Sequence, residues 1–488
     1  MKLRVLMGGA LFFGLVASLP AQASGERLTL ADAVQRTLAQ NRSIKVETFS
    51  RDIAQAYLLA AKGRFDPAIS FESKHAEDGS PASSNPLVRQ LSKSDATQWS
   101  LGGLTPWGLS YSFDARTSNE RGTYNGFANE HSTFGGVTLS QPLLRGFGLG
   151  ANLYEMRIAR ADRRISEWEF RQIVTDTITR VVAAYTDLLL AHEVLRVSQR
   201  SRDLAMNLLT ENEKRFRAGG MSENQLVQAR ARTAARAEAI ILAERAVRDA
   251  DNTLRQLMGE SAFPLTGPLL DVLADPLQES SVEPAADLKA AYALRPDYRQ
   301  ARLGLAKREA GYAFARNQLM PRLDVVGSYG YNGLDEDFAV SRRQVADREY
   351  RSYSAGLVMT VPLTFARERG RVRAAQLEQR QAEADLGRME QEIALNLSLA
   401  AGRLESVKRR VLATRTAFSL ASEALEDELK KLRAGTSSTF VVLSLQESLS
   451  SVELSMHRAR AEERIAAALY DREAGRTLER YAITLSGP

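Results

Sequence analysis

One long stretch of the sequence places mostly apolar residues at the spacing of a coiled coil, and a second stretch has nearly the same length. In the first, Ala151 to about Ala218, the steps alternate between four and three residues, at Val174, Ile178, Val181, Tyr185, Leu188, His192 and Leu195. Such a repeat predicts the a/d seam of a helix that packs against other helices. The second stretch, Ala366 to about Arg433, has nearly the same length, and neither contains proline. At ~1.5 Å per residue each helix would be about 100 Å long, which is too long for one ordinary globular domain to enclose.

A period of two replaces the helical period in residues 68–141 and again in residues 322–361. The first region offers four short alternating segments, near Ile69–Phe71, Trp99–Leu101, Leu109–Ala115 and Val137–Leu139. The stretches Asp78–Asp95 and Ser118–His131 are predicted to be loops, because small and polar residues dominate them. The second region offers two segments with a polar loop between them. This alternation fits the wall of a transmembrane β-barrel and equally fits a half-buried sheet.

The landmarks of the two halves follow one order, which indicates an internal duplication. Each half reads as helix, strands, long helix, glycine-containing tip and returning helix. We expect the helices that precede the strands to cover Leu28–Arg64 and Leu288–Gln318. The predicted divisions are a first repeat at 24–258 with its tip near 217–222, a linker at 259–287, a second repeat at 288–475 with its tip near 433–438, and a tail at 476–488.

The geometry of these elements predicts that one chain is incomplete. Laid end to end, the shorter helices of each repeat match one long helix in length. One chain therefore supplies a layer about four helices wide. That layer is too thin to bury apolar seams on both sides. An open sheet edge is not tolerated in lipid, where unpaired backbone groups find no partner. If the strands lie in a membrane, several copies must therefore close one barrel and one helical tube.

Each repeat must contribute an even number of membrane crossings, because its long helix starts from the same side as the helix before its strands. We expect two of the four first-repeat segments to cross, with the others forming a small hairpin at the membrane edge.

The N-terminus and the composition limit the class of protein. Residues 1–23 are predicted to be a signal peptide, with Lys2 and Arg4 before an apolar stretch and an Ala21-Gln22-Ala23 cleavage site; the alternative is a membrane anchor. No later window approaches the ~20 apolar residues of a spanning helix, so contact with a membrane would have to be made by β-strands. The sequence has no cysteine. Its net charge of +6 comes from interleaved basic and acidic residues, which predicts a solvated helical surface and no nucleic-acid partner.

An enzyme is not expected. The four histidines, His75, His131, His192 and His457, are scattered, and no zinc, P-loop or nucleophile-elbow motif is present. The glycines of residues 146–150 lack the βαβ context of a dinucleotide site and are predicted to form a flexible joint between strand and helix. We therefore assign no catalytic, cofactor or metal residues.

The ordered set of features resembles the TolC-type outer-membrane efflux family over essentially the whole mature chain. It rests on the duplication, on Ser140-Gln141-Pro142-Leu143-Leu144 and Val361-Pro362-Leu363 at strand ends, and on two tips, Phe216 to Ala229 and Leu432 to Leu445. The resemblance implies a mixed α/β membrane protein: a homotrimer with a twelve-stranded barrel in the outer membrane and a twelve-helix tunnel in the periplasm. It implies the channel of a tripartite efflux or type I secretion system, in contact with outer-membrane lipid, a periplasmic adaptor and an inner-membrane pump of the RND, ABC or MFS type.

The resemblance also implies site residues. Adaptor docking would involve Gly219, Gly220, Ser222, Gly435 and Ser438, although the glycines could equally serve as helix caps. Where some relatives carry acidic rings at the periplasmic mouth, this chain has Gln225, Val441 and Ser444. We therefore expect an apolar gate formed by Phe440 with Val441 and Leu443, without a cation-selecting ring; the alternative is that Phe440 packs between helices.

The strongest rival is a soluble periplasmic coiled-coil or adaptor protein, which would carry one helical hairpin between lipoyl-like halves. A diffusion porin is a lesser alternative, because porins lack the long helices. The sequence does not indicate the cargo.

Overall fold

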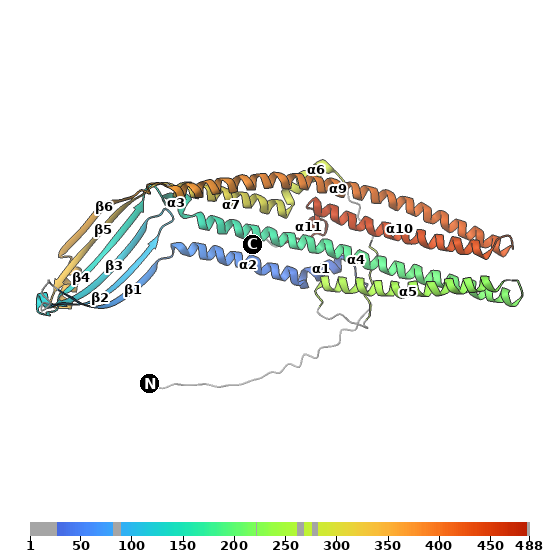
Figure 1. The fold of residues 1–488 in the computed structure, drawn as a ribbon, viewed down its shortest axis with the longest axis horizontal. Coiled ribbons are helices and arrows are strands. Elements are labelled where there is room, and N and C mark those ends of the chain that lie inside the picture. Colours follow the sequence, from blue (N-terminus) through green and yellow to red (C-terminus); the bar gives the residue numbers. More distant parts are fainter. Residues whose placement is uncertain (1–26, 82–88, 221, 261–267, 276–281, 486–488) are drawn as a thin grey trace, which may run out of the picture.

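The computed structural model describes residues 27–81, 89–220, 222–260, 268–275 and 282–485. The predicted signal peptide and part of the predicted linker lie outside the described residues. Within them the molecule is elongated, with a curved sheet at one end and two helical hairpin tips at the other (Figure 1).

Two very long helices run along the molecule, and shorter helices pair with them. The long ones are α4 (Tyr154–Arg217), with 64 residues, and α9 (Ala366–Arg433), with 68. The boundaries of α9 are those predicted, and α4 begins a few residues late because the five-residue α3 precedes it. The other helices are α1 (Leu30–Gln40), α2 (Arg42–Lys62), α3 (Gly148–Asn152), α5 (Glu223–Met258), α6 (Pro284–Leu294), α7 (Pro296–Gln318), α8 (Phe338–Ala346), α10 (Thr439–Glu473) and α11 (Thr477–Arg480).

The two helices predicted to precede the strands, Leu28–Arg64 and Leu288–Gln318, are each divided into two helices. Asn41 separates α1 from α2 because its side chain accepts hydrogen bonds from the N–H groups of Ser43 and Ile44, which caps α2. Its amide nitrogen donates to Leu257 O at 2.8 Å and so fixes the break against α5. Pro296 begins α7, since proline fits the first helical position and lacks the N–H that a continuous helix would need.

The strands found among the described residues belong to one antiparallel sheet in sequence order, β1-β2-β3-β4-β5-β6. They are β1 (Ala68–Pro81), β2 (Arg89–Leu104), β3 (Ser110–Gly122), β4 (His131–Pro142), β5 (Arg322–Asp335) and β6 (Tyr350–Thr360), with lengths between 11 and 16 residues.

This sheet corrects the expectation for the first repeat. The hairpin expected at the membrane edge is not set apart in the structure: all four first-repeat strands pair continuously with their neighbours. The predicted Asp78–Asp95 loop is wrong in large part, because β1 and β2 extend through much of it. Four strands still return the chain to its starting side, as the even-number argument requires. Three copies supply twelve strands only if each supplies four, whereas the described residues of this chain form a sheet of six. The predicted twelve-stranded barrel from three chains therefore does not match this sheet.

The predicted polar loop of the second repeat contains the helix α8. It packs on β4 and β5, where the hydroxyl of Ser341 lies 2.8 Å from that of Thr133. Gly333 is needed at this contact because a Cβ there would lie 2.0 Å from Ser341 O. The polar composition of the segment concealed the helix.

The helices form a layer four wide. Near the sheet the neighbours are α2, α4, α7 and α9 in that order, and beyond the middle they are α5, α4, α10 and α9. The core lies where these two sets meet. Five seam residues of α4 are fully buried there, as predicted: Val174, Ile178, Val181, Tyr185 and Leu188.

The predicted linker and tail add to this core. Leu28 forms a bridge with Val272, and the hydroxyl of Tyr185 lies 2.8 Å from Leu28 O and 2.7 Å from Leu273 O. Burial raises the pKa of Tyr185 to about 12, so the phenol stays protonated as a hydrogen-bond donor. The tail residues Leu478, Tyr481, Ile483 and Leu485 pack on the same cluster. The N-terminal segment, the linker and the tail are thus attached to the middle of α4.

Candidate functional site

The two faces of the sheet differ in chemistry along its whole width. One row of directly paired residues crosses all six strands and is entirely apolar or aromatic: Ile69, Leu101, Phe113, Val137, Tyr329 and Tyr353. Neighbouring rows on this face add Phe71 with Trp99, Tyr111 with Leu139, Val325 with Leu357, and Leu323 with Met359. Many of these side chains are exposed, with 73% of Ile69 and 69% of Leu357 accessible.

The opposite face is polar and small. The row beside the apolar one contains Ser70, Ser100, Asp114, Gly136, Gly330 and Ser352. A soluble sheet would turn its apolar face toward a core, whereas here α8 is the only described α-helix that packs substantially on the sheet, and many of the apolar side chains stay exposed. An exposed apolar band opposite a polar face is the pattern of a barrel wall with lipid outside and water inside.

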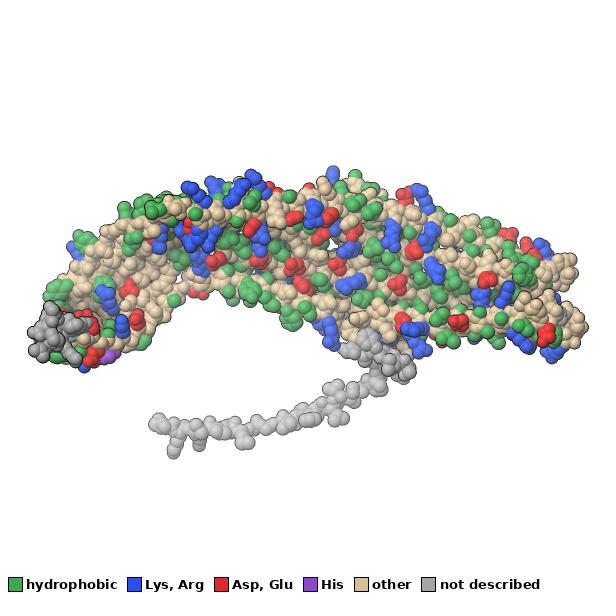
Figure 2. All heavy atoms as spheres, in the orientation of Figure 1, with side chains coloured by type: hydrophobic (Ala, Val, Ile, Leu, Met, Phe, Trp, Pro, Cys, Tyr) green, Lys and Arg blue, Asp and Glu red, His purple; other side chains and the backbone are tan. Residues whose placement is uncertain are grey.

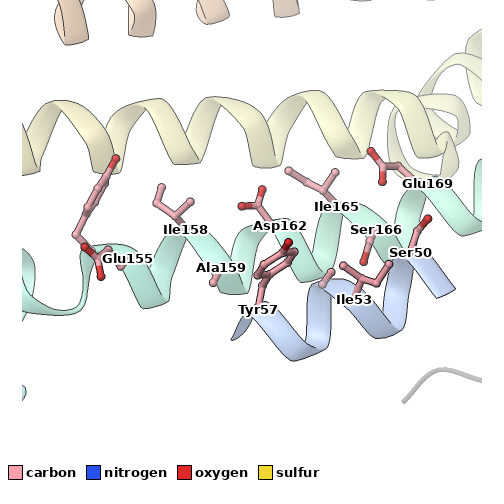
Figure 3. A pocket seen from close by; sticks show the side chains of 12 residues that line it. Ser50, Ile53, Tyr57, Glu155, Ile158, Ala159, Asp162, Ile165, Ser166 and Glu169 are labelled. Atoms are coloured by element: carbon pink, nitrogen blue, oxygen red, sulfur yellow. The ribbon is translucent and has the colours of Figure 1, made fainter. Parts of the chain in front are cut away.

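The helical layer has an open edge at α2. Near the sheet, α2 packs on α4 and exposes an apolar stripe at helical spacing, namely Val46, Phe49, Ile53 and Tyr57, of which Tyr57 is 69% exposed. A groove of about 500 Å³ runs between these two helices, with Ile53 and Tyr57 on one side and Ile158 and Ile165 on the other (Figure 3). Glu155, Asp162 and Glu169 add negative charge to it.

The opposite edge of the molecule, at α9 and β6, is also open. Helix α9 exposes Leu377, Leu395, Leu399, Leu412 and Leu420, and every residue of β6 is exposed. The surface along the helices otherwise mixes acidic and basic side chains (Figure 2). Each edge therefore combines an apolar helix stripe with an unpaired strand, β1 on the α2 side and β6 on the α9 side.

Both hairpin tips end their long helices with the same backbone geometry. Gly219 and Gly435 adopt left-handed φ angles of 76° and 77°. In the first tip the N–H of Gly220 donates to Arg215 O at 2.9 Å, and in the second the N–H of Thr436 donates to Lys431 O at 3.0 Å. These are Schellman caps, in which glycine satisfies the last helix carbonyls.

The serines begin the returning helices at both tips. Ser222 precedes α5, and its N–H donates to the side chain of Gln225 at 3.2 Å, so the residue that replaces an acidic position serves as a helix cap. Ser438 precedes α10 without a side-chain cap bond. The neighbouring Ser437 hydroxyl donates to Glu428, and this bond holds the pKa of Glu428 below its usual value. The five predicted docking residues therefore lie at the two tips.

The predicted gate residues lie in the first turns of α10. Phe440 is 64% exposed, whereas its neighbour Val442 is fully buried and makes the helix-packing contact. The guanidinium of Arg232 on α5 lies 5.7 Å from the centre of the Phe440 ring, at cation–π distance. Val441 and Ser444 are exposed, and Leu443 is partly buried.

The sequence did not predict the contacts between the two hairpins near Phe440. Besides Arg232 on Phe440, Arg236 on α5 lies 3.8 Å from Glu447 on α10. The basic residues of α5 gave no sign of a partner more than two hundred positions away. Only the pairing of the two hairpins in space reveals that both contacts join the first tip to the second.

Two further features are absent from the described part of the chain. No cluster of three or more histidine, aspartate or glutamate side chains there has the arrangement of a metal site. Among the described helices, none has the length and apolar character of a membrane span.

Known proteins match this chain over most of its length. Residues 33–260 and 288–470 match the family described as Outer membrane efflux protein. The pyoverdine export outer membrane protein OpmQ of Pseudomonas putida is 30% identical over 293 residues, which are 57% of this chain. The chain spans 57% of the length of that curated relative.

Solved structures share the fold at low sequence identity. The outer-membrane channel OprN superimposes with a TM-score of 0.67 at 18% identity, covering 91% of this chain and 89% of that one. The outer membrane protein VceC of Vibrio cholerae gives 0.67 at 14% identity, covering 91% and 96%. The MtrE outer membrane channel of Neisseria gonorrhoeae gives 0.65 at 17% identity, covering 92% and 89%. Taken with the matched residues of both halves, these findings mean that the chain belongs to the outer membrane efflux protein family.

Proposed function

We propose that this protein is the outer-membrane channel of a tripartite efflux or type I secretion system. The observation that carries the proposal is the six-strand row of exposed apolar residues that continues into helices of 64 and 68 residues. Lipid would contact that row, and the helices would extend about 100 Å into the periplasm at ~1.5 Å per residue. Substrates would pass from an inner-membrane pump and a periplasmic adaptor to the exterior, without a chemical step.

The closed pipe would be a homotrimer. The two edges of one chain differ: α2 with β1 on one side, and α9 with β6 on the other. Contact between unlike edges repeats head to tail and gives a ring when the rotation closes. Three copies of a four-helix-wide layer would form a twelve-helix tunnel.

The tips would dock the adaptor, and Phe440 would narrow the closed mouth. The two tips, between α4 and α5 and between α9 and α10, lie at the end farthest from the sheet, which is where a partner from the inner membrane would arrive (Figure 1). They carry Gly219, Gly220, Ser222, Gly435 and Ser438. The exposure of Phe440 in its own chain supports this role, because its ring is free to face the lumen.

Fractionation of cells that express the chain tests the main proposal. We expect the mature protein in the outer membrane, and after detergent extraction an oligomer that resists unheated SDS. A monomeric product in the periplasmic fraction would support the soluble adaptor-like alternative and overturn the channel.

Planar bilayers test the gate. Phe440→Ala should raise the conductance of the closed state several-fold, because the apolar ring is removed. Leu432→Ala, in the other helix of the same tip, is the control and should leave it unchanged. An unaltered closed state in Phe440→Ala would remove Phe440 from the gate.

A further inference from the structure

The sheet and the helical layer of one chain have matched widths only when all six strands are counted. Strands ~4.8 Å apart and tilted by about 40° each occupy roughly 6 Å of a barrel's circumference, so six strands cover about 38 Å. Four helices at ~9–10 Å spacing cover about 36–40 Å. Four strands would cover only about 25 Å. A wall of six strands per copy therefore continues the helical tube without a change of diameter.

The residues of β1 and β2 are those of strands that face lipid. Ile69 and Leu101 stand in the same paired row as Phe113, Val137 and Tyr329. The ring of Phe71 lies 4.6 Å from that of Trp99 on the same face, and 56% and 54% of these two side chains are exposed. A hairpin outside the membrane would have no reason to carry this band at the level of the other strands.

The two free strand edges are complementary in direction. Strands alternate along the sheet, so β1 and β6 run in opposite directions. The β6 edge of one copy can therefore pair antiparallel with the β1 edge of the next, as every other pair in the sheet does. Unpaired N–H and C=O groups at both edges then find partners, which lipid requires.

We propose that β6 of each copy pairs with β1 of the next, and that three copies close one barrel of eighteen strands. The inference rests on the proposed channel function and specifies its architecture. The lumen is then as wide at the sheet as in the helical tube, and it is lined by the small polar row that includes Ser100, Gly136 and Gly330. The sheet would not be the narrowest part of the path, so cargo size would be limited at the tips.

Electron cryomicroscopy of the detergent-extracted oligomer tests the strand number directly. A cross-section through the apolar band should show eighteen strands in one closed ring with three-fold symmetry. A closed ring of twelve strands, with β1 and β2 outside the wall, would overturn the inference and leave the channel in place. A product that is monomeric in buffer without detergent would overturn the channel itself.

Disulfide cross-linking gives an independent test, because the natural chain has no cysteine. Ser354→Cys on β6 is combined in turn with cysteine at each of four β1 positions on the same face. We expect at least one β1 combination to yield covalent dimers and trimers on SDS gels. The β1 positions are Ser70, Glu72, Lys74 and Ala76.

The matched panel combines Ser354→Cys with cysteines on β3, which would be the neighbour of β6 in a twelve-stranded ring. No covalent oligomer is expected from it, and covalent trimers from any member would overturn the inference. Ser328→Cys with Ser354→Cys is the control within one chain, since these hydroxyls lie 2.8 Å apart. The β3 positions are Ser112, Asp114, Arg116 and Ser118.

Discussion

The two halves of the chain agree in their long helices and tips and differ in their strands. The long helices have 64 and 68 residues, and both tips use a left-handed glycine with the same carbonyl bond. The first half contributes four strands to the sheet and the second contributes two. Helix length and tip geometry are thus shared, whereas the strand number is not.

The difference has a physical reason. A long helix must reach the same level as its neighbours, because an unequal length would leave one tip out of line with the others. Strands can be added in pairs, since each pair returns the chain to the side from which the long helix begins. The wall of a barrel can therefore be widened without any change in the helices.

The halves also differ at the middle of the molecule. Only the first long helix carries a tyrosine that binds the linker and the N-terminal segment; α9 contains no tyrosine. The core around α4 consequently holds most of the largest fully buried side chains, while α9 contributes Ile393, Leu397 and Leu404 to two smaller clusters. The first half acts as the attachment point and the second packs against it.

The largest expected effect concerns the faces of the shared sheet. Val137→Arg places a charge in the apolar row and should destabilise the inserted barrel by about 2–4 kcal/mol. Thr138→Arg, one residue on and nearly identical in shape, points to the polar face and should cost less than about 1 kcal/mol. Urea unfolding in lipid vesicles measures both. Equal losses of stability in the two variants would mean that the two faces do not contact lipid on one side and water on the other.

Removal of the Tyr185 hydroxyl tests the attachment of the N-terminal segment and the linker to the middle of α4. Tyr185→Phe should lower the free energy of unfolding by about 1–2 kcal/mol, because the carbonyls of Leu28 and Leu273 lose a buried donor. Chemical denaturation of the mature protein is the measurement. Tyr470→Phe is the comparison and should lose less, since Asp287 keeps its ion pair with Arg476 at 2.7 Å. A larger loss from Tyr470→Phe would reverse the assignment of the attachment point.

The tips offer a test that separates capping from other roles of glycine. Gly219→Ala should destabilise the last turn of α4 by about 1 kcal/mol, because its φ of 76° strains any side chain. Gly220→Ala should change little, since its Cβ would stand 3.6 Å from Arg215 O, an ordinary contact. Hydrogen exchange of the amides in that turn reports both. If Gly220→Ala leaves exchange unchanged but abolishes export, the glycine serves docking and not the cap.

The smallest effect is a dependence on pH in the second half. Burial between α10 and α4 lowers the pKa of His457 from 6.5, although Glu193 lies 3.9 Å away and opposes the shift. The unfolded state then binds the proton more readily, so stability should fall as pH drops below about 6.5. His457→Gln should flatten the profile between pH 7.5 and 5.5. A profile that is unchanged by this substitution would exclude His457 as its cause.

The sequence predicted the helices far better than the strands, for physical reasons. A heptad seam such as Val174 to Leu188 is a long, repeated signal, and glycine at Gly219 and Gly435 marks a helix end unambiguously. The outer parts of β1 and β2 carry polar residues on both faces, for example Lys93 and Asp95 on one and Ser92 and Ser94 on the other, because they extend beyond the apolar band. Period-two patterning disappears there, and a strand cannot be distinguished from a loop.

The candidate site was predictable in its positions but not in its contacts. The tip glycines stand out in the sequence as helix ends, and the resemblance to the family implied the position of Phe440 five residues after Gly435. The stacking of Arg232 on Phe440 depends on how two hairpins lie side by side, and α8 is held by contacts with strands from both halves. Such contacts between segments far apart in the chain leave no periodic signal in the sequence.

The central claim is that one copy is an open segment of wall that closes only with others. Native mass spectrometry of the protein extracted from outer membranes measures this directly. We expect a complex of three copies that requires detergent to remain in solution. A single copy that is stable in buffer without detergent would contradict the account.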